Sequence, residues 1–159
     1  MSKQFRYYLR VRYNECDAQK VVFNARYGDY VDLAVTEFFR ALTFEQGLTP
    51  EEFDYQVVKL TIEWRAPAQF RQVLELSTHV SDIGNTSFTI NVSMRIAGGK
   101  EIVARAEMIG VAVDPFTLKK VPMSSEMREA MRRGAPGAWV DHAGYSNQLA
   151  GKNLDLRSQ

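Results

Sequence analysis

Apolar residues alternate with polar ones in five stretches of the chain, and this period of two predicts β-strands with one buried face. The first stretch runs from Phe5 to Tyr13, where the odd positions are apolar and several even positions carry arginine. The other four cover residues 58–64, 74–80, 88–96 and 102–113. The last four are joined by short turn-like segments. Such joins favour antiparallel neighbours, because parallel strands need crossover segments of about a dozen residues or more.

The apolar period changes between the first and the second stretch. From Tyr27 to Leu42, apolar residues recur at steps of three and four, and charged residues lie off that stripe. This pattern predicts an amphipathic helix over about residues 25–42, with Asn24 as its N-cap. One such helix can cover one face of the sheet. The predicted fold class is therefore α+β, with a five-stranded antiparallel sheet wrapped around one long central helix.

The C-terminal part of the chain has a different composition. A short helix is predicted to end at Gly134, which would close a domain of residues 1–134. Residues 135–159 are rich in Gly, Asn, Ser and Gln and show no periodicity. We expect a loosely structured tail there, or one that docks on a neighbouring subunit through Trp139 and Tyr145.

Composition narrows the range of functions. The chain has 159 residues, a net charge of +1 and a single cysteine, Cys16. The charge gives no indication of a nucleic-acid partner, and one cysteine excludes an internal disulfide and a multi-cysteine metal site. No apolar run resembles a signal peptide or approaches the length of a membrane span. We therefore expect a soluble, cytoplasmic protein that needs no metal ion or cofactor.

The polar stretch NECDAQKVVFNARY, residues 14–27, places Asp17 between the first strand and the helix. A loop aspartate commonly stabilises a turn by accepting hydrogen bonds from nearby backbone amides. A second role is also compatible with the spacing. The segment from Asp17 to Asn24 is long enough to fold the acid back over the helix start, where free N–H groups meet the positive end of the helix dipole.

Four motifs in order give this chain a family resemblance. They are VRYNECDAQKVVFNARYGDYVDLAVTEFFRAL, VKLTIEWRAPAQF, SDIGNTSF and VAVDPFTLKKVPM. Together they resemble the 4-hydroxybenzoyl-CoA thioesterase-like group of the hotdog superfamily over roughly residues 7–133. The resemblance implies a homodimeric or homotetrameric acyl-CoA thioesterase with its active site at a subunit interface. It also implies that Asp17 is the catalytic aspartate and that the backbone N–H of Asn24 faces the thioester oxygen.

The predicted reaction and the matched motifs also indicate residues that bind the substrate. The candidates for binding the substrate or its CoA part are Tyr27, Val58, Lys59, Asn85, Thr86 and Ser87. Two positions depart from the family pattern. Val35 replaces an arginine that is common in the family's helix, and Lys20 stands where the family usually has glycine. Since glycine tolerates positive φ at little cost and lysine does not, we expect a different backbone path there.

Several alternatives stay open at this point. Asp17 can attack the thioester directly or act as a general base on water. Asp32 and Glu37 are rival carboxylates, although a solvated or ion-paired helix face accounts for both. Cys16 is a weak candidate nucleophile, because neither His79 nor His142 is placed to activate it. The absence of a histidine at the loop also argues against a hotdog dehydratase. A non-catalytic acyl-binding protein and a thioesterase for acyl-carrier protein are the remaining alternatives.

Overall fold

The five alternating stretches form the five strands that the sequence predicts. Their bounds are β1 (Phe5–Arg10), β2 (Tyr55–Trp64), β3 (Val73–Ile83), β4 (Ser87–Ile96) and β5 (Ile102–Ala112). The strands lie in the order β2-β5-β4-β3-β1, and all contacts among them are antiparallel. The structure is a computed structural model that describes residues 4–48, 53–145 and 152–153. The predicted five-stranded antiparallel core is confirmed.

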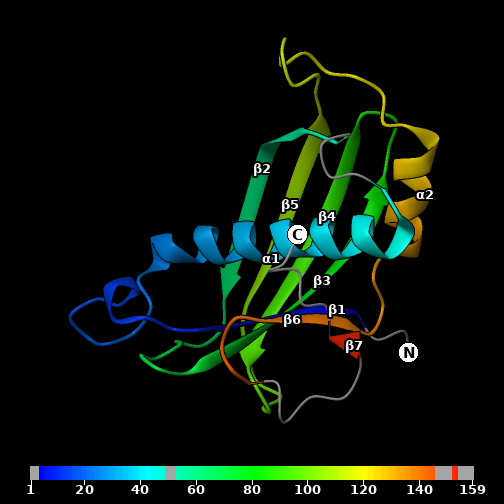
Figure 1. Ribbon diagram of the computed structural model, residues 1–159. Coiled ribbons are helices and arrows are strands. Elements are labelled where there is room, and N and C mark those ends of the chain that lie inside the picture. The colour runs from blue at the N-terminus through cyan, green and yellow to red at the C-terminus, as the bar shows by residue number, and fades with distance from the viewer. Residues whose placement is uncertain (1–3, 49–52, 146–151, 154–159) are drawn as a thin grey trace.

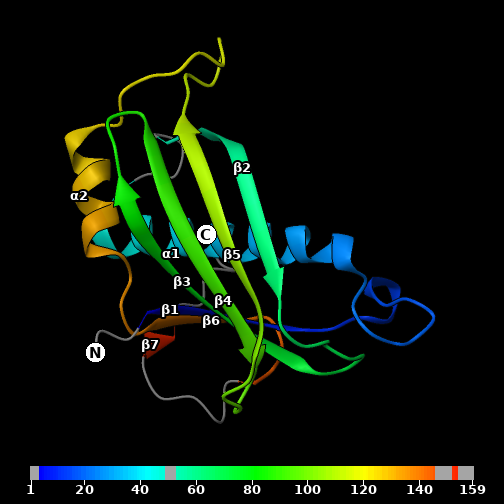
Figure 2. The same cartoon turned by 180° about the vertical axis from the view of Figure 1, so that it is seen from behind.

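The helix α1 (Tyr27–Gln46) crosses one face of this sheet (Figure 1). It follows a short 3-10 helix, Asn24–Arg26, and ends at Gly47, whose φ of 67° gives a left-handed C-cap. The periodicity predicted an end near residue 42, whereas the helix extends to Gln46. Seen from behind, the strands lie in front of α1, so the helix covers only one of their two faces (Figure 2).

The core lies between α1 and the covered face of the sheet. Its largest buried side chains include Tyr7, Tyr27, Tyr30, Phe38, Leu42, Leu74, Leu76, Phe88, Ile90 and Met94. Packing is closest where β4 and β5 pair. A Cβ atom built on Gly110 would lie 2.3 Å from Cζ of Phe88, so only glycine lets this ring lie against β5.

A second helix, α2 (Ser125–Arg133), packs near the C-terminal end of α1 (Figure 1). The hydroxyl oxygen of Ser124 caps it by accepting a 3.1 Å hydrogen bond from the N–H of Met127. The side chain of Gln46 on α1 donates a 3.0 Å hydrogen bond to the carbonyl oxygen of Ala130. Because α2 ends at Arg133, before Gly134, the predicted end of this helix is confirmed.

The predicted loose tail is wrong for the segment that follows α2. Ala138–Asp141 form β6, which pairs in parallel with β1, and β7 (Lys152–Asn153) pairs with β6. Trp139 is 4% exposed, so it packs within its own chain instead of presenting a free docking surface. The sheet thus has seven strands, with two parallel strands added beyond β1 (Figure 1).

At the other edge of the sheet, β2 has no neighbouring strand beyond it in the described part of the chain. Nearly all of its residues are exposed or half-buried, and four large apolar side chains are exposed: Val57, Val58, Leu60 and Trp64. An open strand edge with exposed apolar side chains is a site where another chain can pair.

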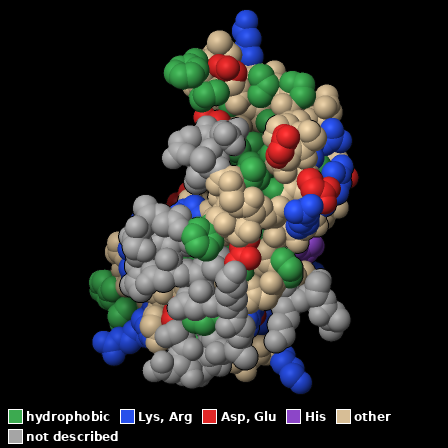
Figure 3. Space-filling view, turned by 45° about the vertical axis from the view of Figure 1, so that its right-hand side comes forward, with side chains coloured by type: hydrophobic (Ala, Val, Ile, Leu, Met, Phe, Trp, Pro, Cys, Tyr) green, Lys and Arg blue, Asp and Glu red, His purple; other side chains and the backbone are tan. Residues whose placement is uncertain are grey.

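A short hairpin projects beyond β5, at the top of Figures 1 and 3. Val113 forms a bridge with Lys120, and the carboxylate of Asp114 accepts hydrogen bonds from the N–H groups of Phe116 and Thr117, at 2.9 and 2.8 Å. These bonds lower the pKa of Asp114. The ring of Phe116, which is 93% exposed, is thus held outward on a structured turn.

Candidate active site

The predicted catalytic loop connects β1 to α1 and is called here the Asp17 loop (residues 15–23). Its two arms pair with each other. The N–H of Phe23 donates to the carbonyl oxygen of Glu15, and the N–H of Asp17 donates to that of Val21, both at 2.9 Å. The second arm also binds the segment before β3, because the N–H of Val22 donates to the carbonyl oxygen of Ala68 at 2.8 Å. The loop is therefore a fixed hairpin.

Asp17 lies at the tip of this hairpin, with its side chain exposed. Its carbonyl oxygen accepts the N–H of Lys20 at 2.9 Å, which closes a β-turn. Its Oδ1 accepts the N–H of Gln19 at 2.8 Å, the local bond that loop aspartates often make. Asp17 thus stabilises the turn, as the first interpretation predicts. This hydrogen bond uses Oδ1, and no hydrogen bond to Oδ2 is found within the described part of the chain.

Lys20 adopts a φ of 62°, the left-handed conformation that glycine favours. This is the residue that ends a three-residue hairpin turn, where a left-handed glycine normally forms a bulge. The lysine has therefore not removed the left-handed turn, contrary to our expectation of a different backbone path. Steric contact of its Cβ atom makes this conformation about 1–2 kcal/mol less favourable than it would be for glycine.

The prediction that Asn24 caps α1 is wrong. The N-cap of α1 is Arg26, and Asn24 is the first residue of the 3-10 helix that precedes α1. The asparagine side chain is exposed and makes no capping hydrogen bond. Its backbone N–H is nonetheless the first of a helical segment, and such groups have no partner within their helix. The role of this N–H toward the thioester oxygen stays a prediction.

Sequence reasoning missed Glu15, which is only 5% exposed. Its carboxylate pairs with the guanidinium of Arg12 at 2.9 Å and accepts a 3.0 Å hydrogen bond from the hydroxyl of Tyr30 on α1. Burial and the neighbouring Glu15 carboxylate raise the pKa of Tyr30 above its ordinary value, so this hydroxyl keeps its proton. The only signal in the sequence was an arginine three residues before an acid at a strand end.

The other candidate catalytic residues, Glu37, Asp32 and Cys16, differ from Asp17 in burial or in hydrogen-bond partners. Glu37 is buried and pairs with Arg40 at 2.9 Å, whereas Asp32 is exposed on α1. The thiol of Cys16 lies 3.6 Å from the carbonyl oxygen of Arg12, and burial raises the pKa of this thiol. A raised pKa keeps the sulfur protonated, which disfavours its use as a nucleophile.

The predicted substrate-binding residues do not gather in one place within a single chain. Val58 and Lys59 lie on β2, at a point where the register with β5 shifts. The turn of Asn85, Thr86 and Ser87 joins β3 to β4. It is anchored by its backbone, because the carbonyl oxygen of Thr86 accepts the N–H of Ala112 at 2.7 Å.

Tyr27, the sixth predicted binding residue, is 1% exposed. Its ring meets that of Trp64 edge to face, with centroids 5.9 Å apart. Tyr27 therefore does not present its ring at the surface of this chain.

The histidines lie away from Asp17. His142 follows β6, and its Nδ1 lies 3.0 Å from the hydroxyl oxygen of Tyr7. Both residues line a cavity of about 330 Å³ between β1 and the first half of α1, together with Leu9, Arg10, Arg12, Glu15, Tyr30 and Leu33.

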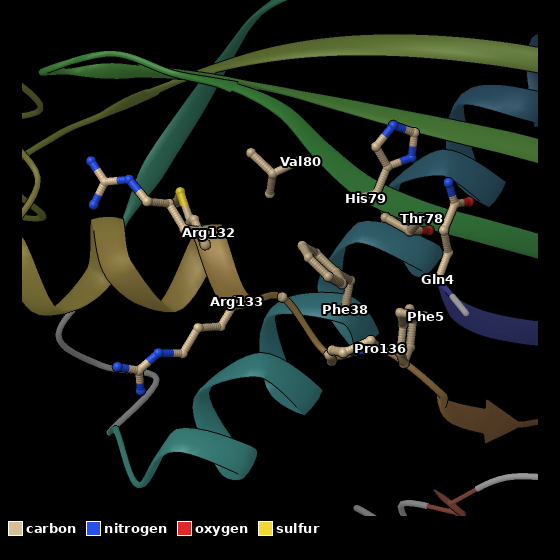
Figure 4. Close-up of a pocket in the computed structure, with 12 residues that line it drawn as sticks. Gln4, Phe5, Phe38, Thr78, His79, Val80, Arg132, Arg133 and Pro136 are labelled. Carbon is tan, nitrogen blue, oxygen red and sulfur yellow. The ribbon is translucent and has the colours of Figure 1, made fainter. Parts of the chain in front are cut away.

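His79 lies by a second cavity of about 330 Å³, beside the later part of α1 and α2 (Figure 4). Its lining includes Phe5, Phe38 and Thr78, together with Arg132 and Arg133 at the end of α2 (Figure 4). Asp17 lines neither cavity.

The described residues contain no group of three or more His, Cys, Asp or Glu side chains that could hold a metal ion. Within the same part of the chain, no helix combines the length and the apolar character needed to cross a membrane.

A long helix laid across a five-stranded antiparallel core is the hotdog fold. The chain belongs to the thioesterase-like superfamily, whose family model matches residues 11–131. The resemblance drawn from the sequence motifs is thereby confirmed.

Individual relatives agree with this assignment. The chain is 34% identical to acyl-CoA thioester hydrolase YbgC of Escherichia coli O6:H1 (strain CFT073) over 117 residues, which cover 72% of this chain and 86% of that protein. It is 23% identical to long-chain acyl-CoA thioesterase FadM of Escherichia coli (strain K12), over 79% of this chain and 95% of that protein. The crystal structure of YbaW from Escherichia coli has the same fold, with a TM-score of 0.70 at 22% identity, over 82% of this chain and 98% of that chain.

Proposed function

We propose that this protein hydrolyses acyl-CoA thioesters to a free acid and CoA, with Asp17 as the catalytic carboxylate. The observation that carries the proposal is the exposed Asp17 carboxylate on a fixed hairpin that leads directly into the start of a helix. The family assignment and the similarity to YbgC support the reaction class and the CoA thioester substrate.

The chemistry needs few groups. A simple thiol has a pKa of about 8.5, so the CoA thiolate leaves with little help from an acid. In one route the free oxygen of Asp17 attacks the thioester carbon and expels the CoA thiolate, and water then hydrolyses the resulting mixed anhydride to the free acid and the Asp17 carboxylate. In the other route Asp17 removes a proton from a water that attacks the same carbon, and the thiolate leaves. In either case the carbonyl oxygen becomes negative. The N–H of Asn24 then stabilises this charge at the positive end of the helical segment.

The active site is proposed to need two copies of the chain. The turn 85–87 is bonded to Ala112, which pairs with Tyr55 at the first end of β2. Trp64, at the other end of β2, packs on the start of α1 beside the Asp17 loop. Within one chain, the turn 85–87 and the Asp17 loop therefore lie at opposite ends of β2. A second copy, paired antiparallel along the open β2 edge, brings its own turn to this Asp17 loop.

This arrangement gives a role to five of the six predicted binding residues, all except the buried Tyr27. Lys59 and Val58 lie along the paired edge, where the lysine is exposed to meet a phosphate. The partner's turn supplies small hydrogen-bond donors for the CoA chain. The active site then lies at the subunit interface of a homodimer, or of a tetramer made from two such dimers.

A thiol-release assay over aromatic, short-chain and long-chain acyl-CoAs tests the proposal, with the matching acyl-carrier-protein thioesters run in parallel. We expect hydrolysis of at least one acyl-CoA well above the uncatalysed rate. Faster turnover of the carrier-protein thioesters would instead identify an acyl-carrier-protein thioesterase. Binding of acyl-CoA in a calorimeter without any release of thiol would identify a non-catalytic acyl-binding protein.

A further inference from the structure

The buried carboxylate of Glu15 takes no part in the proposed chemistry, yet it has an unusually complete set of partners. Oε1 accepts the backbone N–H of Arg12 at 2.7 Å and the hydroxyl of Tyr30 at 3.0 Å. Oε2 accepts Nη2 and Nε of Arg12 at 2.9 and 3.2 Å. These four hydrogen bonds fix the orientation of the carboxylate from both the segment that follows β1 and the helix α1.

The backbone of the same residue closes the Asp17 loop. The carbonyl oxygen of Glu15 accepts the N–H of Phe23 at 2.9 Å. Phe23 directly precedes Asn24, and Asp17 lies two residues after Glu15 in the chain. Glu15 therefore joins three parts of the molecule: the end of β1 through Arg12, the second arm of the loop through Phe23, and α1 through Tyr30.

Stability alone does not account for a carboxylate at this position. Taking a charge out of water is costly, and replacing a buried ion pair by apolar residues is often neutral or stabilising. A buried acid with four directional bonds does, however, fix a geometry that apolar packing leaves looser. The geometry fixed here is that of the two residues proposed to act on the thioester.

We infer that Glu15 is a positioning residue for the proposed reaction. It holds the Asp17 loop against α1, so that the Asp17 carboxylate and the Asn24 N–H keep a constant separation. Because this inference rests on the proposed function, it predicts an effect on turnover more than on substrate binding. A displacement of about 1 Å between reacting groups can cost about a hundredfold in rate.

Two variants test the inference from the two sides of the contact. Glu15→Gln removes the charge that binds Arg12, and Tyr30→Phe removes only the hydroxyl from α1. We expect Glu15→Gln to lower kcat by about 10- to 100-fold with KM changed less than about threefold. Tyr30→Phe should lower kcat by a smaller factor. The double variant should lose little more than Glu15→Gln alone, since both changes break the same contact.

Glu37→Gln is the matched control. Glu37 is 6% exposed and is paired with an arginine three residues away, as Glu15 is, but it has no hydrogen bond to the Asp17 loop. If Glu37→Gln lowers kcat and the free energy of unfolding as much as Glu15→Gln does, the loss is a general stability effect and the inference is overturned. If Glu15→Gln fails to fold, Tyr30→Phe decides the question by the same comparison.

Amide hydrogen exchange gives a readout that does not depend on activity. The N–H groups of Phe23 and Asp17 should exchange faster in Glu15→Gln than in the parent, while those of β4 remain unchanged. Unchanged exchange at both loop amides would overturn the positioning role, even in an active enzyme. If the parent protein hydrolyses no thioester, the proposed function fails, and the exchange rates still decide whether Glu15 fixes the loop.

Discussion

The ring of Trp64 packs edge to face on the ring of Tyr27, with centroids 5.9 Å apart and 88° between the ring planes. Trp64 ends β2, the open edge strand, and Tyr27 begins α1. The edge proposed to pair with a second copy is thus in direct contact with the helix start that follows the Asp17 loop. Pairing at this edge and the geometry of the site should therefore be linked.

A charge placed on the open edge should separate the subunits. Leu60 is 41% exposed on β2, and Leu60→Lys puts an unpaired ammonium where the second copy is proposed to pack. We expect sedimentation to show a shift from a dimer or larger species to the monomer, with turnover reduced at least tenfold. Phe116→Lys is the control, because Phe116 is also exposed but lies on the hairpin beyond β5. An unchanged mass for Leu60→Lys would refute pairing through β2.

The left-handed Lys20 offers a test of the loop geometry by stability. Lys20→Gly keeps all backbone hydrogen bonds of the turn and removes the steric cost of a φ of 62°. We expect a net rise of about 1 kcal/mol in the free energy of unfolding. The relieved steric cost is larger than this, but the greater freedom of glycine in the unfolded chain offsets part of it. Urea unfolding measures this change. Gln19→Gly, at a neighbour without a positive φ, should lower stability instead, and a gain there would contradict the explanation.

Tyr7 should make the folded state sensitive to alkaline pH. Burial, followed by the nearby Glu37 carboxylate, raises the pKa of Tyr7 to about 12. Since the folded state holds the proton more tightly than the unfolded state, this contribution is fully present below about pH 10 and is lost as the pH rises toward 12. It amounts to about 2–3 kcal/mol. Ultraviolet titration should show one fewer late-ionising tyrosine in Tyr7→Phe, and an identical titration curve would contradict this.

The sequence predicted the antiparallel core well because the strands and the helix differ in hydrophobic period. Each of the five strands needs only one buried face, and α1 supplies the cover, so local alternation already carries the information. The resemblance located the Asp17 loop for a similar reason, since its residues are contiguous in the chain.

Features that depend on distant partners were missed. β6 is four residues long, and its burial comes from β1, more than a hundred residues earlier, so no local period marks it. Asn24 was taken for a cap because its residue type favours that position, but the extra 3-10 turn moves the N-cap to Arg26. Glu15 was not singled out in the sequence, because only the fold brings Tyr30 to it.

The backbone at Asn24 allows its N–H to be removed without breaking the helix start. Phe23, the preceding residue, has φ −64° and ψ 134°, which suits a following proline, and the first helical position needs no donor. We expect Asn24→Pro to fold and to lower turnover by about 10²–10³, the usual cost of one oxyanion donor. Asn24→Ala keeps the N–H and loses no cap, so its turnover should stay near the parental value. Parental turnover in folded Asn24→Pro would exclude this donor.

Asp17→Asn separates the turn role of this residue from the catalytic one. An asparagine Oδ1 can accept the N–H of Gln19 just as the carboxylate does at 2.8 Å, so the hairpin and the unfolding free energy should be preserved. The anionic oxygen that attacks the thioester or accepts a proton from water is lost. We therefore expect turnover to fall at least about a hundredfold. Asp29→Asn is the control, because it removes an exposed negative charge from the first turn of α1 and should leave turnover within about twofold. If folded Asp17→Asn hydrolysed acyl-CoA at the parental rate, Asp17 would be a turn residue only, and Asp32 would be the next carboxylate to replace.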